Sequence, residues 1–183
     1  ILDMTGDDPL NDYVQDIVFD GIEFAYSDYN LQEVDGSHGY ASVQGAIVLK
    51  AFGLENQHDD IYRTYDIPIA AVHVSSARNV KFLNGAIRHT GSVGMHVEND
   101  VIDIDITGNY FGKTSGAGIV IGHPTHVYEN DGPEHHVNAN NSAGPDREKF
   151  PAGTEGVPTN ISLTNNYFLE NCYFFSSHSP ITS

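Results

Sequence analysis

The stretch VIDIDITGNYFGKTSGAGIVIG, residues 101–122, has its apolar residues in bursts of two to four, separated by Thr-Gly-Asn and Lys-Thr-Ser-Gly. Such bursts are too short for the apolar stripe of an amphipathic helix, and they recur too regularly for a loop. Gly and Asn enter left-handed backbone geometry at low cost, so they mark tight turns. The stretch therefore predicts short β-strands joined by tight turns.

The same pattern recurs in four segments that superpose without gaps. They are IVFDGIEF (17–24), VKFLNGAI (80–87), IDITGNYF (104–111) and ISLTNNYF (161–168). Apolar residues occupy the first, third and eighth positions of each segment. The fifth position is Gly21, Asn84, Gly108 or Asn165. We expect this position to be a turn in every copy, because these residue types tolerate a positive φ.

A second motif accompanies the first: AIVL (46–49), AVHV (71–74), GMHV (94–97) and GIVI (118–121). The spacing from Val80 to Ile104 is 24 residues, and so is the spacing from Met95 to Ile119. Each period then holds three short strands, which is typical of a solenoid. Hairpin signals such as Asn-Gly between alternating strands are nearly absent, which disfavours a β-sandwich. The sequence predicts an all-β chain, a right-handed parallel β-helix of about five coils forming one domain over 1–183.

Three insertions interrupt the repeat, at 27–44, 50–68 and 122–158. Each one leaves or rejoins the chain beside the second motif. Long loops on one side of a rigid scaffold are where binding residues usually lie. We therefore expect these insertions to form the walls of a groove whose base is the second-motif strand.

The charge of the chain restricts its partners. The formal net charge is −17, from 25 acidic and 8 basic residues. Such a surface repels phosphate backbones and anionic membranes, so we expect no nucleic-acid or membrane partner. A neutral sugar or a cation is compatible with this charge. Cys172 is the single cysteine, so no disulfide forms within the chain.

Neither end of the sequence resembles the cap that the open end of a β-helix requires. The first residues, ILDMTGDDPLND, include no start methionine and no signal-peptide pattern, and the last residues are SSHSPITS. We expect a central piece of a longer helix, completed by further coils or by a second chain of the same enzyme.

Two histidines are candidates for the base of the groove. The middle residue of the second motif points outward in this arrangement, and it is Val48, His73, His96 or Val120. Neighbouring coils are about 4.8 Å apart, so His73 and His96 are expected to lie side by side. Adjacent imidazoles can bind sugar hydroxyls, orient a carboxylate or chelate a metal.

A second column of polar residues is expected at one rim of the groove. Its members precede the second-motif strand, and they are Tyr26, His89, Lys113 and Glu170. Glycoside hydrolysis requires two carboxylates, at about 5–5.5 Å or 6.5–9.5 Å. The catalytic candidates are the acidic residues closest to the groove in this register, namely Glu98, Asp100 and Asp28.

No metal signature is recognisable in the sequence. The segment 123–156 contains four histidines without zinc-site spacing: His123, His126, His135 and His136. Oxygen-rich residues near the N-terminus match no calcium loop: Asp7, Asp8, Asn11 and Asp12. We therefore expect no cofactor, with calcium as the one ion that the composition leaves open.

Residues 67–122 resemble secreted right-handed β-helix proteins of the kind grouped around glycoside hydrolase family 141. The resemblance rests on AAV (70–72), ARNVKF (77–82), IRHTG (87–91), GAG (116–118) and ITGNYF (106–111). The flanking stretches 14–28 and 150–168 are similar to a preceding and a following coil. The resemblance implies a secreted, carbohydrate-active protein that hydrolyses a glycosidic bond with two carboxylates. It also implies that His89 is a groove residue.

One departure from this family leaves other activities open. The chain has Lys113 in FGKTSG (111–116), where similar sequences have an acid. Lys113 and His89 would suit a polysaccharide lyase on the same fold, which abstracts a proton beside a uronate, commonly with calcium. The other alternative is a non-catalytic, carbohydrate-binding or adhesin-type β-helix.

Overall fold

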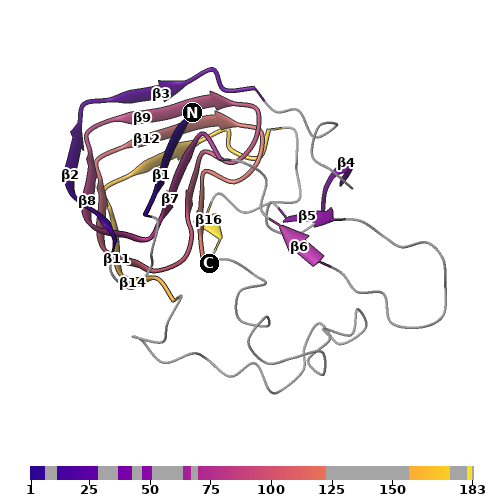
Figure 1. Ribbon diagram of the computed structural model, residues 1–183. Coiled ribbons are helices and arrows are strands. Elements are labelled where there is room, and N and C mark those ends of the chain that lie inside the picture. The colour runs from indigo at the N-terminus through magenta and orange to yellow at the C-terminus, as the bar shows by residue number, and fades with distance from the viewer. Residues whose placement is uncertain are drawn as a thin grey trace, which may run out of the picture.

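The computed structural model describes residues 1–6, 12–28, 37–42, 47–50, 64–66, 70–122, 157–173 and 181–182. These residues form strands and turns and contain no helix, so the described part of the chain is all-β, as expected (Figure 1). Among them, accordingly, no helix has the length and apolar character needed to cross a membrane.

Most strands belong to three sheets in which every neighbouring pair is parallel. The first sheet contains, in order, β1 (Leu2–Thr5), β7 (Val72–Ser75), β10 (Met95–Val97), β13 (Ile119–Ile121) and β16 (Ile181–Thr182). The second contains β2 (Val14–Asp20), β8 (Ala77–Leu83), β11 (Val101–Thr107) and β14 (Thr159–Thr164). The third contains β3 (Glu23–Ala25), β9 (Ala86–Thr90), β12 (Tyr110–Thr114) and β15 (Tyr167–Leu169).

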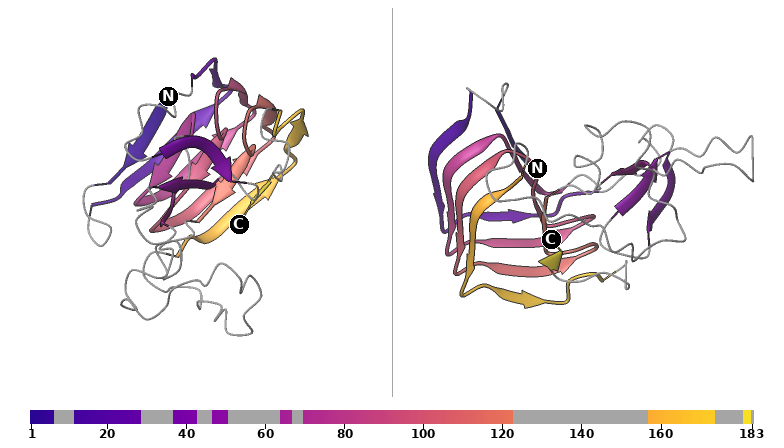
Figure 2. Two further views of the ribbon diagram at one scale, coloured as in Figure 1. Left: turned by 90° about the vertical axis from the view of Figure 1, so that its right-hand side faces the viewer. Right: turned by 90° about the horizontal axis from the view of Figure 1, so that it is seen from below.

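The chain visits these sheets in a fixed order, which we call a circuit. One circuit is β1, β2 and β3, and the next is β7, β8 and β9. The following circuits are β10, β11 and β12, and then β13, β14 and β15. Figure 2 shows equivalent strands of successive circuits stacked on one another.

The strand registers confirm the alignment of the four repeated segments. Ile17 and Ile104 both pair with Val80, and Ile104 also pairs with Ile161. The predicted turn column is confirmed as well. Its φ angles are +68° at Gly21, +51° at Asn84, +72° at Gly108 and +53° at Asn165. The sequence therefore correctly placed both the inward apolar positions and the turn between the second and third sheets.

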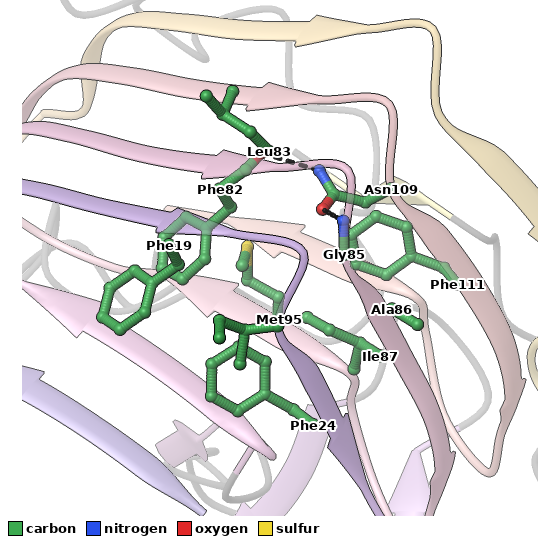
Figure 3. Close-up of a pocket in the computed structure, with 11 residues that line it drawn as sticks. Phe19, Phe24, Phe82, Leu83, Gly85, Ala86, Ile87, Met95, Asn109 and Phe111 are labelled. Carbon is green, nitrogen blue, oxygen red and sulfur yellow. Dashed lines mark hydrogen bonds between the residues drawn. The ribbon is translucent and has the colours of Figure 1, made fainter.

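The core lies between the three sheets and consists of stacked equivalents from successive circuits. Phe19 and Phe82 stack with ring centroids 4.9 Å apart, and Phe111 stacks on Phe168 at the same distance. Figure 3 shows this interior around the buried Met95. The cavity among these side chains measures about 10 Å³, which is at the lower limit for one water molecule. This cavity, among the described residues, therefore has no room for a ligand.

One predicted strand is paired differently from the expectation. Residues 46–49 were assigned to the second-motif column, but β5 (Ile47–Lys50) forms a separate antiparallel sheet with β4 (Ser37–Ser42) and β6 (Thr64–Asp66). Strand β1 takes the expected place, with Leu2 opposite Val72 and Met4 opposite Val74. A strand of three or four residues has too few apolar positions to specify its partner. In LDMT, Leu2 and Met4 alternate with polar residues, so this segment fits the column as well as AIVL does.

The small sheet lies within the region of the first two predicted insertions. Strand β4 falls inside 27–44, and β6 falls inside 50–68. Residues 123–156, most of the third predicted insertion, lie outside the described residues, as do the four histidines within them. Asp7, Asp8 and Asn11 of the N-terminal oxygen-rich group also lie outside the described part.

Candidate functional site

The predicted rim column forms a ladder across four circuits. Tyr26 follows Ala25, which pairs with Arg88, and His89 therefore lies beside Tyr26. Lys113 and Glu170 continue the column, because Gly112 pairs with both Arg88 and Leu169. All four members have a positive φ, between +52° and +61°. Such angles are rare for residues with a Cβ atom, so the repeated turn geometry imposes them on side chains with no preference for them.

A cavity of about 510 Å³ opens beside this ladder. This volume lies within the range of about 300–1,000 Å³ that small-molecule sites occupy. Most of the residues that line it have polar side chains, and they are Ser27, His89, Thr90, Gly91, Lys113, Ser115, Glu170 and Tyr173. The cavity therefore spans several neighbouring circuits and offers hydroxyl, imidazole, ammonium and carboxylate groups.

The ladder also contains stacked aromatic rings and one ion pair with a long separation. Tyr26 stacks on His89 with ring centroids 5.0 Å apart and planes within 3° of parallel. Tyr173, in the cavity lining, is 66% exposed. Lys113 Nζ lies 3.8 Å from Glu170 Oε2, and both side chains are about half exposed, so this pair contributes little to stability. Both charged groups remain accessible to a ligand.

The two groove histidines lie side by side, as the sequence predicted. His73 pairs with His96 across β7 and β10, and the ring centroids are 5.5 Å apart. The flanking residues Val72 and Val74 belong to the core, so the histidines face the opposite side of the first sheet. Neither histidine is among the described residues that line the cavity. The predicted groove that would join both groups has most of its walls outside the described residues, so it stays a prediction.

His73 lies between two carboxylates. Its Nε2 is 2.6 Å from Glu98 Oε2, and its Nδ1 is 2.9 Å from Asp3 Oδ1. The hydrogen bond to Glu98, supported by that to Asp3, raises the pKa of His73, although partial burial opposes the shift. The hydrogen bond from His73 lowers the pKa of Asp3. The sequence does not reveal the contact of Asp3 with His73, because its pattern favours residues 46–49 for the position that β1 occupies.

The catalytic candidates from the sequence are dispersed. Glu98 contacts His73, and Asp100 lies in the turn before β11 with φ +51°. Asp28 is exposed and follows Ser27 of the cavity lining. Three strand spacings, about 14 Å in total, separate the circuits of Asp28 and Glu170, and this exceeds the about 6.5–9.5 Å of an inverting pair. Among the described lining residues, Glu170 is the sole carboxylate.

Comparison of the chain with protein-family models, with curated proteins and with solved structures gave no match.

Proposed function

We propose that the chain is a right-handed parallel β-helix of the kind found in proteins resembling glycoside hydrolase family 141. Three parallel sheets that are visited in a fixed order, with turns in register, support this fold. Connections between neighbouring parallel strands are right-handed in nearly all proteins, which supports the handedness. The AAV, IRHTG and ITGNYF motifs support the family relationship.

We further propose that the protein is a secreted glycoside hydrolase that acts on a neutral oligo- or polysaccharide in the 510 Å³ cavity. The observation that supports this most directly is the lining of the cavity. Its donors and acceptors suit sugar hydroxyls, and the exposed Tyr173 offers an apolar face with a polar tip. Glu170 is the carboxylate that we assign to proton transfer at the glycosidic oxygen.

The net charge supports a neutral substrate over a uronate polymer. A chain with a charge of −17 repels a polyanion, and Lys113, the cavity's one lysine or arginine among described residues, already lies near Glu170. A hydrolase is therefore favoured over a lyase. Further coils, or a second chain, are proposed partners that would complete the substrate-binding surface.

A non-catalytic carbohydrate-binding role is the second candidate. It is favoured by the presence of a single carboxylate among the described lining residues, because hydrolysis by the usual mechanism uses two. In that case the cavity would hold a sugar without cleaving it.

The test compares Glu170→Gln with a matched control. Glu23→Gln removes the charge of another exposed glutamate in an ion pair, since Glu23 Oε1 lies 2.7 Å from Arg88 Nε outside the cavity lining. Both variants and the wild type are assayed against cello-, xylo- and galacto-oligosaccharides, with calorimetric binding measured in parallel. We expect Glu170→Gln to lose about 10²–10⁴-fold in kcat and to retain binding, because a general acid acts on the transition state. Glu23→Gln should match the wild type.

Two outcomes would change this conclusion. Equal turnover by the wild type and Glu170→Gln would remove Glu170 from the reaction. Saccharide binding by a wild-type protein that releases no product would establish the binding role in place of the hydrolase.

A further inference from the structure

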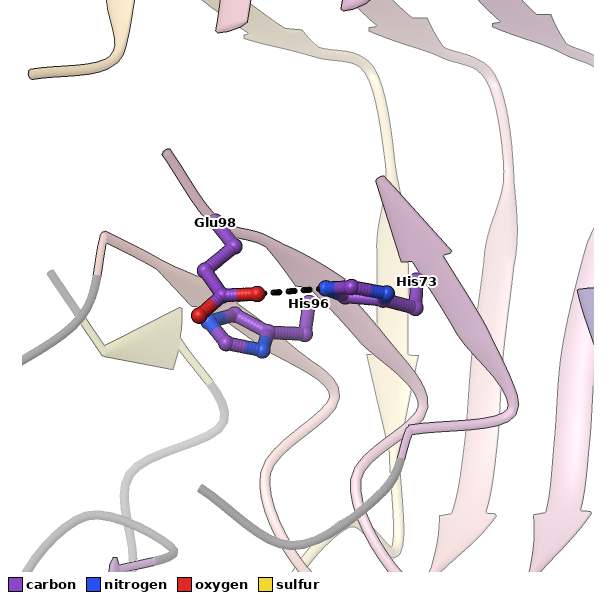
Figure 4. A group of neighbouring side chains, drawn as sticks. All are labelled: His73, His96 and Glu98. Atoms are coloured by element: carbon purple, nitrogen blue, oxygen red, sulfur yellow. Dashed lines mark hydrogen bonds and ion pairs between the residues drawn. The ribbon is translucent and has the colours of Figure 1, made fainter. Parts of the chain in front are cut away.

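The first sheet brings three side chains with metal-ligand chemistry together outside the cavity. His73 on β7 and His96 on β10 are register neighbours, and Glu98 follows β10. Figure 4 shows the carboxylate of Glu98 beside both imidazole rings. His96 is 5% exposed, while the side chains of His73 and Glu98 are 25% and 19% exposed. The three side chains are therefore mostly buried, but water can still reach His73 and Glu98.

The spacing of the three groups suits a small cation. One ring nitrogen of each histidine and a carboxylate oxygen of Glu98 all lie within 4.8 Å of one another. Ligands at about 2.0–2.2 Å from a tetrahedral zinc ion are separated from one another by about 3.3–3.6 Å. Side-chain rotations that open the short contact of His73 with Glu98 and draw His96 closer would satisfy this geometry.

Each histidine also has a hydrogen-bond acceptor at one of its ring nitrogens. Asp3 Oδ1 lies 2.9 Å from Nδ1 of His73, and the carbonyl oxygen of Gly122 lies 2.9 Å from Nε2 of His96. A carbonyl oxygen only accepts, so His96 Nε2 donates to it, and metal binding by His96 would use Nδ1. Metal-binding histidines are oriented by this kind of partner, a carboxylate or a backbone carbonyl on the second ring nitrogen.

We propose that His73, His96 and Glu98 form a binding site for a divalent transition-metal ion, with zinc as the expected occupant. The ion would take the place of the proton that His73 shares with Glu98. Two imidazoles and one carboxylate leave a fourth tetrahedral position for water, as in open zinc sites. Calcium and magnesium prefer all-oxygen ligand sets, so the two imidazoles disfavour them. Asp3 and the Gly122 carbonyl act as orienting partners.

The site is independent of the proposed saccharide cavity, because none of its three ligands is among the described residues of that lining. A failure of the metal proposal therefore leaves the hydrolase proposal intact, and the reverse also holds.

The experiment uses the full chain after chelator treatment and gel filtration. Zinc binding is measured by calorimetry, and cobalt binding is measured by visible absorption. The variants are Glu98→Gln and Asp3→Asn, which keep side-chain shape, and His96→Ala. His89→Ala is the matched control, since His89 lies in the rim column away from the cluster. Far-ultraviolet circular dichroism shows whether each variant retains the β structure.

We expect the wild type and His89→Ala to bind one more zinc equivalent than His96→Ala. Asp3→Asn should weaken that site about 10–100-fold, and Glu98→Gln, which changes a ligand itself, should weaken it at least as much. Cobalt should give the absorption of a four-coordinate ion, and excess calcium should not displace it. The comparison between variants is necessary because the chain has ten histidines, and zinc bound elsewhere would be common to all variants.

The proposal is overturned if folded Glu98→Gln, Asp3→Asn and His96→Ala bind zinc with the wild-type stoichiometry and affinity. It is equally overturned if the wild type binds no zinc, or if calcium competes with zinc on equal terms. In the first two cases the cluster is a hydrogen-bonded network around His73, and in the third it is not a transition-metal site.

Discussion

Asn109 illustrates how single side chains hold the turns of this fold. It is 6% exposed, its Oδ1 accepts from Gly85 N–H at 2.9 Å, and its Nδ2 donates to the Phe82 carbonyl at 2.8 Å (Figure 3). The next circuit repeats the arrangement, since Asn166 accepts from Asn109 N–H at 2.8 Å and donates to the Ile106 carbonyl at 2.7 Å. These amides bond each turn to backbone groups of the preceding circuit.

The substitution Asn109→Ala leaves the Gly85 N–H and the Phe82 carbonyl without these partners. We expect it to lower the free energy of unfolding by about 2–4 kcal/mol, because each buried group that loses its hydrogen bond costs about 1–3 kcal/mol. Urea unfolding monitored by circular dichroism measures the change.

Asn84→Gly is the control in the neighbouring turn column. Asn84 is exposed at φ +51°, which glycine adopts freely, and its Nδ2 donates a hydrogen bond to the exposed Asp20. A change within about 0.5 kcal/mol is expected. Equal losses for the two asparagines would contradict the distinction between a buried and an exposed role.

Residue types predicted some of the left-handed positions and not others. The column containing Gly21 and Asn84 was predicted, because glycine and asparagine have an intrinsic preference for this geometry. The rim column has φ values just as positive at Tyr26, Lys113 and Glu170. These residue types have no such preference, so stacking on the neighbouring circuits sets their backbone, and sequence alone could not reveal it.

At the scale of elements, the sequence located the repeated strands but not every partner. The β2, β8, β11 and β14 strands have seven- or six-residue patterns with several matching apolar positions, which fix their register. The second-motif strands have only three or four residues. With so few positions, LDMT and AIVL fit the same column, and only the packed structure decides between them.

The pairing of β1 with β7 predicts a core role for Met4, which is 6% exposed and pairs with Val74. Met4→Ala should destabilise the protein by about 2 kcal/mol, the lower end of the range for buried methionine, because β1 lies at the edge of its sheet. Ile1→Ala is the control, since Ile1 is 79% exposed and a change within about 0.5 kcal/mol is expected. If Met4→Ala is as stable as Ile1→Ala, β1 does not occupy the predicted column.

At the scale of the molecule, the repeat predicted the histidine pair and the rim column, but not Asp3 beside His73, nor four polar residues of the cavity lining: Ser27, Thr90, Ser115 and Tyr173. The histidine neighbours and the rim column followed from the repeat alone, because a parallel stack places equivalent residues side by side. The contact of Asp3 with His73 forms because β1 pairs with β7. The cavity forms where the chain turns from the third sheet to the first. Both features arise from tertiary packing, which the repeat pattern does not encode.

We propose that a saccharide binds in the cavity beside the rim column, and not at the histidine cluster or in the protein interior. The most direct measurement is a crystal structure of the wild-type chain soaked with the oligosaccharide that binds most tightly in calorimetry. We expect sugar density over Tyr173, His89, Lys113 and Glu170, with a glycosidic oxygen within hydrogen-bond distance of the Glu170 carboxylate. Sugar density elsewhere on the protein, with the cavity holding only solvent, would contradict it.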